Sequence, residues 1–222
     1  MIRVLVVDDL PSARFGLRVL LDARDDIEVV GEAPTAIEAL TAIAALTPDV
    51  VLMDVRMPGM DGIEATRLIN ASVTGRRVPV IVMSTFDEDA HVFDAIDAGA
   101  AGFVLKGASG DEFADAVRQA ARGEGLLSKT VTKRVLDEFA QRAAAVNARR
   151  GDHAGLAQLT RRERDVILEV CRGMTDSEIA AELHIGVYTV KDHLVQIRRK
   201  IGVRNRTAIM GWAVQNGLYP GG

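Results

Sequence analysis

The sequence predicts two structural units: an α/β doubly wound, five-stranded parallel sheet, followed by an all-α helix-turn-helix domain of four helices. Two observations predict this organisation. Up to about residue 122, short apolar runs alternate with helix-length amphipathic segments, which is typical of β-α units. From Leu159 onward, apolar residues recur at three- and four-residue spacing, which indicates helices. A chain of 222 residues is long enough for two small domains.

Five strands are expected in the first half of the chain. Each is a short run of mostly apolar, strand-forming residues, and continuous runs of this kind favour strands that are buried on both faces of a parallel sheet. The expected strands cover residues 2–7, 27–30, 50–53, 80–83 and 102–105. The helices between and after them cover about 11–23, 36–46, 62–70, 87–98 and 110–122, and the crossovers should be right-handed.

Polar side chains follow four of these strands, at the point where each strand ends. Asp8 and Asp9 follow the first, Asp54 the third, Ser84 the fourth and Lys106 the fifth. Because the carboxyl ends of parallel strands lie along one edge, these side chains should converge. Three carboxylates in one crevice repel one another unless a cation joins them, and oxygen-only ligands favour Mg²⁺. Asp54 taken alone could simply end its strand, but in this company it is a candidate nucleophile that would form an aspartyl phosphate.

Four motifs in this half resemble the receiver domain of a two-component response regulator, in order and in spacing. They are Val7-Asp-Asp9, Met53-Asp-Val-Arg-Met-Pro-Gly-Met-Asp-Gly62, Met83-Ser-Thr85 and Phe103-Val-Leu-Lys106. The resemblance covers residues 1–122 and implies a flavodoxin-like sheet with strand order 2-1-3-4-5. It also implies that a sensor histidine kinase phosphorylates the chain.

The resemblance assigns roles to particular residues. Asp54 would accept the phosphoryl group, and Lys106 would contact the phosphoryl oxygens. Mg²⁺ would be held by a set of oxygen ligands: Asp8, Asp9, Asp54 and the backbone carbonyl of Arg56. Ser84 and Phe103 would form a switch pair that responds to the phosphoryl group. Without the resemblance, Phe103 could be an ordinary core aromatic and Lys106 a solvated surface lysine.

Charge is distributed unevenly along the chain. Residues 1–124 hold 11 Lys and Arg against 21 Asp and Glu, whereas residues 156–222 hold 10 against 7. This asymmetry favours two domains with different partners. We therefore expect a receiver domain over 1–124, a helical and flexible linker over 125–155, and a DNA-binding domain over 156–222. No apolar run approaches the roughly 18 residues of a membrane span, and no secretory signal precedes the first strand, so we expect a cytoplasmic protein without a membrane partner.

The second half contains the pattern of a helix-turn-helix. Capping boxes at Thr160 and Thr175 should start two helices, and a third is expected over about 188–200. Residues 186–206 hold six Lys and Arg, and Asp192 is their one acidic residue. Such a charge run is usually a solvated face, but on the third helix of a helix-turn-helix it favours contact with double-stranded DNA.

This half resembles the LuxR-type domain of the NarL/FixJ family over about residues 156–218. The motifs are Leu159-Thr-Arg-Arg-Glu163, Glu178-Ile-Ala180, Thr189-Val-Lys-Asp-His193 and Lys200-Ile-Gly-Val203. The resemblance implies a set of DNA-contacting residues: Lys191, His193, Gln196 and Arg199. It also implies a dimerisation surface on the last helix, about 207–216, with Ile209, Met210 and Trp212; Trp212 could instead pack in the core of its own domain.

Two residues depart from the LuxR-type pattern. Gly186 stands where the family commonly has a serine that caps the recognition helix, which should weaken the start of that helix slightly. Asp192 places a carboxylate near the groove-facing end of the same helix. It could accept a hydrogen bond from the amino group of a cytosine, or it could cap backbone N–H groups.

The sequence therefore predicts a response-regulator transcription factor. Phosphorylation of Asp54 would control dimerisation and sequence-specific DNA binding, with Mg²⁺ as the cofactor. The chain would be a phosphoacceptor rather than an enzyme, with intrinsic autodephosphorylation left open. One alternative is a DNA-binding regulator that acts without phosphorylation. Another is a phosphatase-like enzyme, although that chemistry usually needs an Asp-x-Asp pair after the first strand, and here Asp8 and Asp9 are adjacent.

Overall fold

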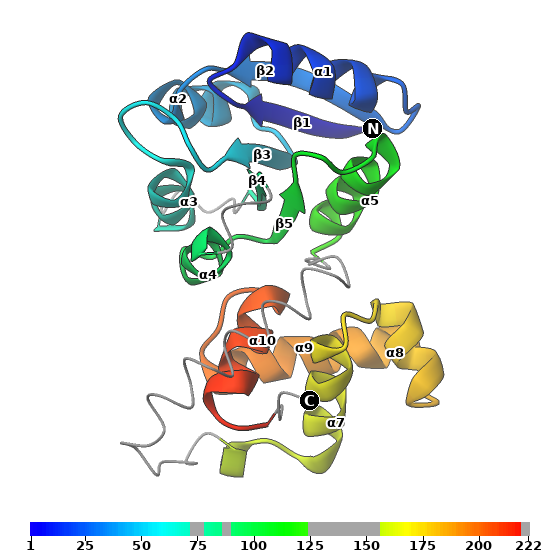
Figure 1. Ribbon diagram of the computed structural model, residues 1–222. Coiled ribbons are helices and arrows are strands. Elements are labelled where there is room, and N and C mark those ends of the chain that lie inside the picture. Colours follow the sequence, from blue (N-terminus) through cyan, green and yellow to red (C-terminus); the bar gives the residue numbers. More distant parts are fainter. Residues whose placement is uncertain (72–77, 86–89, 124–155, 219–222) are drawn as a thin grey trace. The chain divides into compact units, whose positions relative to one another are not determined.

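Residues 1–71, 78–85, 90–123 and 156–218 are described in the computed structural model of the protein (Figure 1). The chain divides into two units, Met1–Leu126 and Leu127–Gly222, each with its own buried core. The linker expected over residues 125–155 lies outside the described residues.

The first unit is built on a parallel sheet with strand order β2-β1-β3-β4-β5, as the sequence predicts. Its strands are β1 (Ile2–Val7), β2 (Ile27–Ala33), β3 (Val50–Asp54), β4 (Val80–Ser84) and β5 (Gly102–Leu105). Every residue of β3 and β4 is buried. Continuous burial of the two central strands is what their unbroken apolar runs require, because helices cover both faces of such a sheet.

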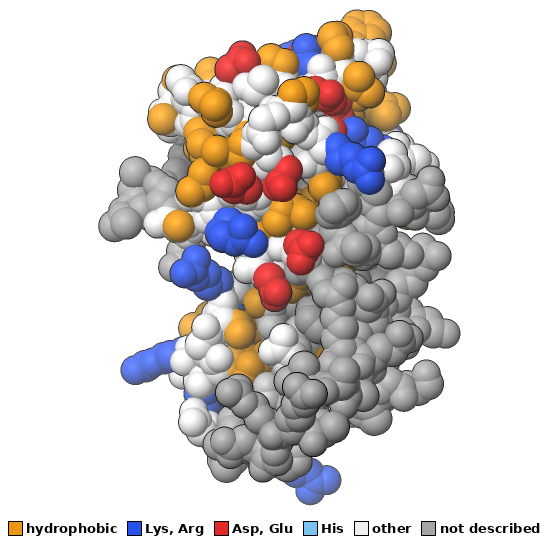
Figure 2. All heavy atoms as spheres, turned by 60° about the vertical axis from the view of Figure 1, so that its left-hand side comes forward, with side chains coloured by type: hydrophobic (Ala, Val, Ile, Leu, Met, Phe, Trp, Pro, Cys, Tyr) orange, Lys and Arg blue, Asp and Glu red, His pale blue; other side chains and the backbone are white. Residues whose placement is uncertain are grey.

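Helices cover the two faces of the sheet. Figure 1 shows α1 (Pro11–Asp22) beside α5 (Gly110–Ala121) on one face, and α2 (Ala36–Leu46), α3 (Gly62–Ala71) and α4 (Ala90–Asp97) on the other. Side chains of α1 and α5 pack with those of the central strands in one apolar cluster that includes Leu21, Leu52 and Phe113. Figure 2, which turns the α2–α4 side toward the viewer, shows acidic, basic and apolar side chains interspersed on the surface.

The second strand is longer than the sequence indicates. The sequence predicts a strand over residues 27–30, but β2 continues to Ala33. It does so because it goes on pairing with β1, up to Val7 opposite Ala33, after a register shift between Val4 and Leu5. The start of the fourth helix, expected near residue 87, lies outside the described residues.

The second unit is helical throughout its described part. It contains a short 3₁₀ helix η1 (Leu156–Gln158), then α7 (Arg161–Cys171), α8 (Asp176–Glu182), α9 (Val187–Ile201) and α10 (Arg206–Gln215). The capping boxes predicted at Thr160 and Thr175 are both formed, with Glu163 and Glu178 as the partners. None of the described helices is both long and apolar enough to span a membrane.

Two basic residues of the 186–206 charge run serve the fold of this unit. The ammonium of Lys200 lies 2.7 Å from the buried carboxylate of Glu163 on α7. The buried guanidinium of Arg206 lies 2.5 Å from Asp176 and also donates to the Met174 carbonyl. These ion pairs join α9 to α7 and α10 to α8. Removing one partner would leave the other charge buried without a counter-charge, which is strongly destabilising.

The surface expected for dimerisation needs a correction. Ile209 and Met210 are 0% and 4% exposed, so their side chains pack in the core of their own unit rather than on its surface. Their position on α10 has a simple cause, because that helix packs against both α7 and α9. Trp212 is partly exposed, and it is the one member of the expected trio that reaches the surface.

Gly62, the first residue of α3, lies very close to the backbone of Asp54. A Cβ built on Gly62 would lie 1.9 Å from the backbone oxygen of Asp54, whereas a Cβ on Gly16 within α1 meets nothing within 4 Å. Gly62→Ala should therefore lower the free energy of unfolding by at least about 2 kcal/mol, through overpacking against backbone. Gly16→Ala should raise it by about 0.5–1 kcal/mol. Urea unfolding followed by far-UV circular dichroism compares the two, and equal effects would contradict the close approach at Asp54.

Candidate functional site

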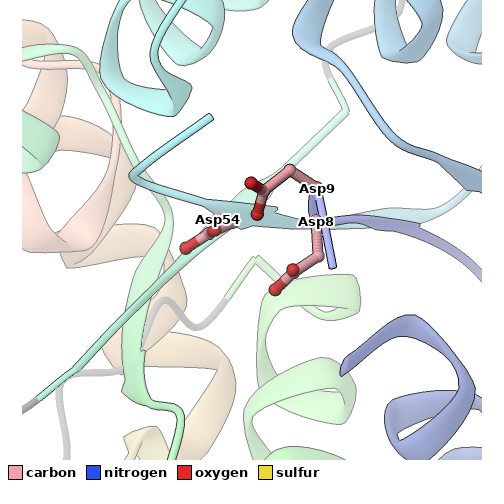
Figure 3. Close-up of side chains that lie close together, drawn as sticks. All are labelled: Asp8, Asp9 and Asp54. Carbon is pink, nitrogen blue, oxygen red and sulfur yellow. The ribbon is translucent and has the colours of Figure 1, made fainter. Parts of the chain in front are cut away.

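Three carboxylates meet at the carboxyl edge of the sheet. Asp8 and Asp9 follow β1, Asp54 is the last residue of β3, and one oxygen of each lies within 4.8 Å of the others (Figure 3). The pairing of β1 with β3 explains this, because Val7 lies opposite Met53 and the residues that follow them are therefore neighbours. Asp8 and Asp54 are 0% and 3% exposed, and Asp9 is partly exposed.

Lys106 brings a positive charge to the two buried carboxylates. Its ammonium nitrogen lies 2.8 Å from Oδ2 of Asp8 and 2.9 Å from Oδ1 of Asp54. Its backbone is anchored beside β4, where its N–H donates to the Ser84 carbonyl at 2.8 Å. Since β5 is two strands away from β3, a long side chain is needed to span the gap, which a lysine supplies.

Burial and charge compete at Asp54. Burial raises the pKa of the Asp54 carboxyl, and the nearby charge of Asp8 adds to this, while Lys106 and a hydrogen bond from the Arg56 N–H oppose it; the net shift is upward. Burial alone would lower the pKa of Lys106, but its contacts with Asp8 and Asp54 outweigh that and raise it. The raised pKa of Asp54 is thus due mainly to burial, and the negative charge of Asp8 adds to it.

This donor set fits a hard divalent cation. Its described ligand candidates are carboxylate oxygens alone, which suit Mg²⁺, Ca²⁺ or Mn²⁺ rather than metals that prefer sulfur or imidazole. The expected contribution of the Arg56 carbonyl stays a prediction, because the described contact of Arg56 with the pocket is made by its N–H.

Ser84 and Phe103 lie on the same face of the sheet. Phe103 pairs with Val82, and Ser84 is two residues further along β4, so the two side chains share a side. Both are buried, at 1% and 4% exposure. The Ser84 hydroxyl donates to the Thr85 carbonyl at 3.3 Å, a long hydrogen bond that a better acceptor could replace.

Arg14 is a residue of the site that the sequence reasoning missed. From the first turns of α1 its guanidinium donates to the carbonyls of Asp8 and Asp9, at 2.7 and 3.3 Å, and it also pairs with Glu32 on β2. A usable signal was present, since an arginine one turn into the helix that follows an Asp-Asp pair can reach back to the preceding loop.

The expected DNA-contacting residues share the outer surface of α9. Lys191, Gln196 and Arg199 are exposed and His193 is partly exposed, while Val190, Leu194 and Ile197 are buried beneath them. Helix α9 begins at Val187 with Gly186 as its N-cap, and no side chain caps it. Asp192 lies in the second turn, beyond the free N–H groups of the first, so the expectation that it caps the helix is wrong.

Each of the two units matches a known protein family. The response regulator receiver domain family matches residues 4–118, and the bacterial regulatory proteins of the luxR family match residues 157–213. The transcriptional regulatory protein LiaR of Bacillus subtilis is 39% identical over 98% of this chain and 99% of its own length. The response regulator protein VraR of Staphylococcus aureus is 36% identical over 98% of each chain.

A solved structure extends the likeness over the whole chain. The crystal structure of the response regulator ChrA, from a heme-sensing two-component system, is 37% identical, covers 98% of both chains and superposes with a TM-score of 0.52. The chain therefore belongs to the two-component response regulators that join a receiver domain to a LuxR-type DNA-binding domain.

Proposed function

We propose that this chain is a cytoplasmic transcription factor whose DNA binding is controlled by phosphorylation of Asp54. One observation carries the proposal: Asp54 is a buried carboxylate at a strand end, within 4.8 Å of two further carboxylates and 2.9 Å from a lysine. Together these groups suit a transferred phosphoryl group, whose oxygens need positive charge on several sides. The domains we propose are a receiver over 1–124, a linker over 125–155 and a DNA-binding domain over 156–222.

The proposed chemistry is transfer from a phosphohistidine of a sensor histidine kinase. A carboxylate oxygen of Asp54 attacks phosphorus, the P–O bond forms as the P–N bond breaks, and the imidazole leaves. The ammonium of Lys106 lies 2.8 Å from Asp8 and 2.9 Å from Asp54, which supports a contact between Lys106 and a phosphoryl oxygen on Asp54. Mg²⁺ held by Asp8, Asp9, Asp54 and the Arg56 carbonyl would neutralise charge on the phosphoryl oxygens.

The proposed switch begins at Ser84. A phosphoryl group on Asp54 adds about −1.5 to −2 charges and three acceptor oxygens, to which the Ser84 hydroxyl would turn from the Thr85 carbonyl. Phe103, on the same face of the sheet, would rotate into the vacated space and change the surface near β5. This is a shift between two populations of the receiver domain.

We propose that α9 reads DNA through Lys191, His193, Gln196 and Arg199. The distribution of basic residues supports this, since Lys200 and Arg206 are committed to Glu163 and Asp176 inside the unit. A homodimer would place two such helices in major grooves about 34–36 Å apart. Of the α10 residues first expected at the dimer contact, Trp212 is retained because it is partly exposed.

Asp192 is proposed to read a base. It is exposed on α9, and among the described residues it has no hydrogen bond or ion pair. A carboxylate that faces phosphates weakens binding, whereas a carboxylate that accepts from the amino group of a cytosine gains a charge-assisted hydrogen bond. The proposal is thus a preference for cytosine at one position of each half-site.

Asp54→Asn tests the phosphoacceptor. The variant should lose phosphorylation by acetyl phosphate with Mg²⁺, because an amide is not a nucleophile, and it should lose the phosphodonor-dependent gain in binding to its own promoter region. Phosphate-affinity gels and footprinting measure the two effects. Asp25→Asn, an exposed aspartate outside the pocket, is the matched control and should behave as the parent protein.

The same experiment separates the alternatives. A regulator that acts without phosphorylation would bind the promoter equally well with and without the phosphodonor. A phosphatase-like enzyme would turn over exogenous phosphate esters, which the proposed phosphoacceptor should not do.

Lys191→Ala tests the DNA surface. Affinity for DNA should fall, and the slope of log affinity against log salt should shrink by about 1 if Lys191 meets a phosphate. Lys200→Ala is the matched control: it should lower the free energy of unfolding by stranding Glu163 and leave the salt slope unchanged. An unchanged affinity for the Lys191 variant throughout the salt series would rule out the contact.

Asp192 can be tested by selecting binding sites from randomised half-sites. The parent protein should enrich cytosine at one position, Asp192→Ala should accept every base there, and Asp192→Asn should shift the preference toward adenine, which asparagine recognises. Identical base profiles for the three proteins would eliminate base reading by Asp192.

A further inference from the structure

The backbone of the Asp8-Asp9 turn is held from outside the pocket by one side chain. A single nitrogen of Arg14, Nη1, donates to the carbonyls of Asp8 and Asp9, at 2.7 and 3.3 Å. Inside the turn, the Leu10 N–H donates to the Asp8 carboxylate at 2.9 Å. Asp8 is therefore fixed through both its backbone and its side chain.

Asp9 depends more heavily on its backbone. Among the described residues its carboxylate has no hydrogen bond or ion pair, unlike the carboxylates of Asp8 and Asp54, which both contact Lys106. Figure 3 shows the Asp8 and Asp9 side chains leaving the chain in different directions from adjacent positions. The described contact of Asp9 with Arg14 is therefore made by its backbone carbonyl.

Arg14 is itself held by Glu32 at the far end of β2. Its Nε lies 3.2 Å from Oε2 of Glu32, and its side chain is only 13% exposed. Arg18 binds the other oxygen of Glu32 at 2.6 Å, but its Nη1 donates to the Val29 carbonyl and pairs with Asp22 rather than with the turn. The hydrogen bond from Arg18, followed by the contacts of Arg14, keeps the pKa of Glu32 below its usual value despite burial.

We propose that Arg14 is a positioning residue for the divalent-cation site, which acts by fixing the Asp8-Asp9 turn so that both carboxylates face the cation, with Glu32 orienting Arg14. The inference rests on the proposed function, because it assumes that the pocket binds such a cation. It makes Arg14 part of a chain of contacts that runs from β2 through α1 to the acidic turn.

The sign of the effect distinguishes positioning from charge. Removing a positive charge near three carboxylates should by itself tighten the binding of a cation. Removing the groups that orient the ligands should weaken it, and the loss of such supporting contacts typically costs 10–100-fold in metal affinity. Arg18 is the matched control, because it has the same charge and the same Glu32 partner but does not touch the turn.

The test is a titration of the full chain with Mn²⁺, an oxygen-preferring probe, followed by electron paramagnetic resonance. Asp9→Asn defines which binding belongs to the pocket. Arg14→Ala should raise the Mn²⁺ dissociation constant by at least about tenfold, and Arg18→Ala should change it by less than about twofold. Arg14→Lys should restore part of the affinity, because an ammonium can donate to the carbonyls but lacks the fork that also engages Glu32.

Several outcomes overturn the inference. Equal or tighter Mn²⁺ binding by a folded Arg14→Ala variant would do so, as would an equal loss in Arg18→Ala. If Arg14→Ala is not folded by circular dichroism, Arg14→Met, which keeps the apolar stem but has no donor, decides alone, and parent-like affinity of that variant refutes the role. If the parent protein shows no Mn²⁺ binding that Asp9→Asn removes, the proposed metal site itself is refuted. If the parent protein binds Mn²⁺ and Arg14→Ala binds it equally well, only the role of Arg14 is refuted.

Discussion

The contact of one lysine with two buried carboxylates is the constraint on which the first unit depends. Lys106 lies 2.8 and 2.9 Å from Asp8 and Asp54 because the strands that carry these residues, β1, β3 and β5, end at the same edge of the sheet, with β4 between β3 and β5. The buried strands hold these ends in place, and the charges would be costly in such a core if they were not paired. The fold and the site therefore depend on each other. The sheet brings the charged side chains together, and their pairing offsets the cost of burying them.

The second unit divides its charges in a different way. Lys200 and Arg206 pair with the buried carboxylates of Glu163 and Asp176, and these pairs join the helices, whereas Lys191 and Arg199 are exposed on the surface of α9. Counting basic residues along 186–206 thus overstates the charge available to DNA. The exposed carboxylate of Asp192 reduces the net positive charge of that surface further.

Most of the fold and of the acidic pocket could be predicted because each depends on local sequence. Unbroken apolar runs mark buried strands, capping boxes mark helix starts, and Asp8, Asp9, Asp54 and Lys106 stand where strands end. The predictions went wrong where pairing or packing between distant segments decides. Strand β2 reaches Ala33 because β1 continues to pair with it, and Met210 is buried because α10 packs on α7 and α9.

The sequence by itself determined the order of elements, the two units and the residues that meet at the sheet edge, because strand ends and helix caps depend on residues that are neighbours in the sequence. Only the tertiary structure decided which charges are committed and which remain available. The contacts that decide this join segments whose proximity the hydrophobic pattern of the sequence does not predict. They are Glu163 with Lys200, Asp176 with Arg206, and Arg14 with the carbonyls of Asp8 and Asp9. Such contacts depend on how side chains project in three dimensions, and this geometry exists only once the helices and strands have packed together.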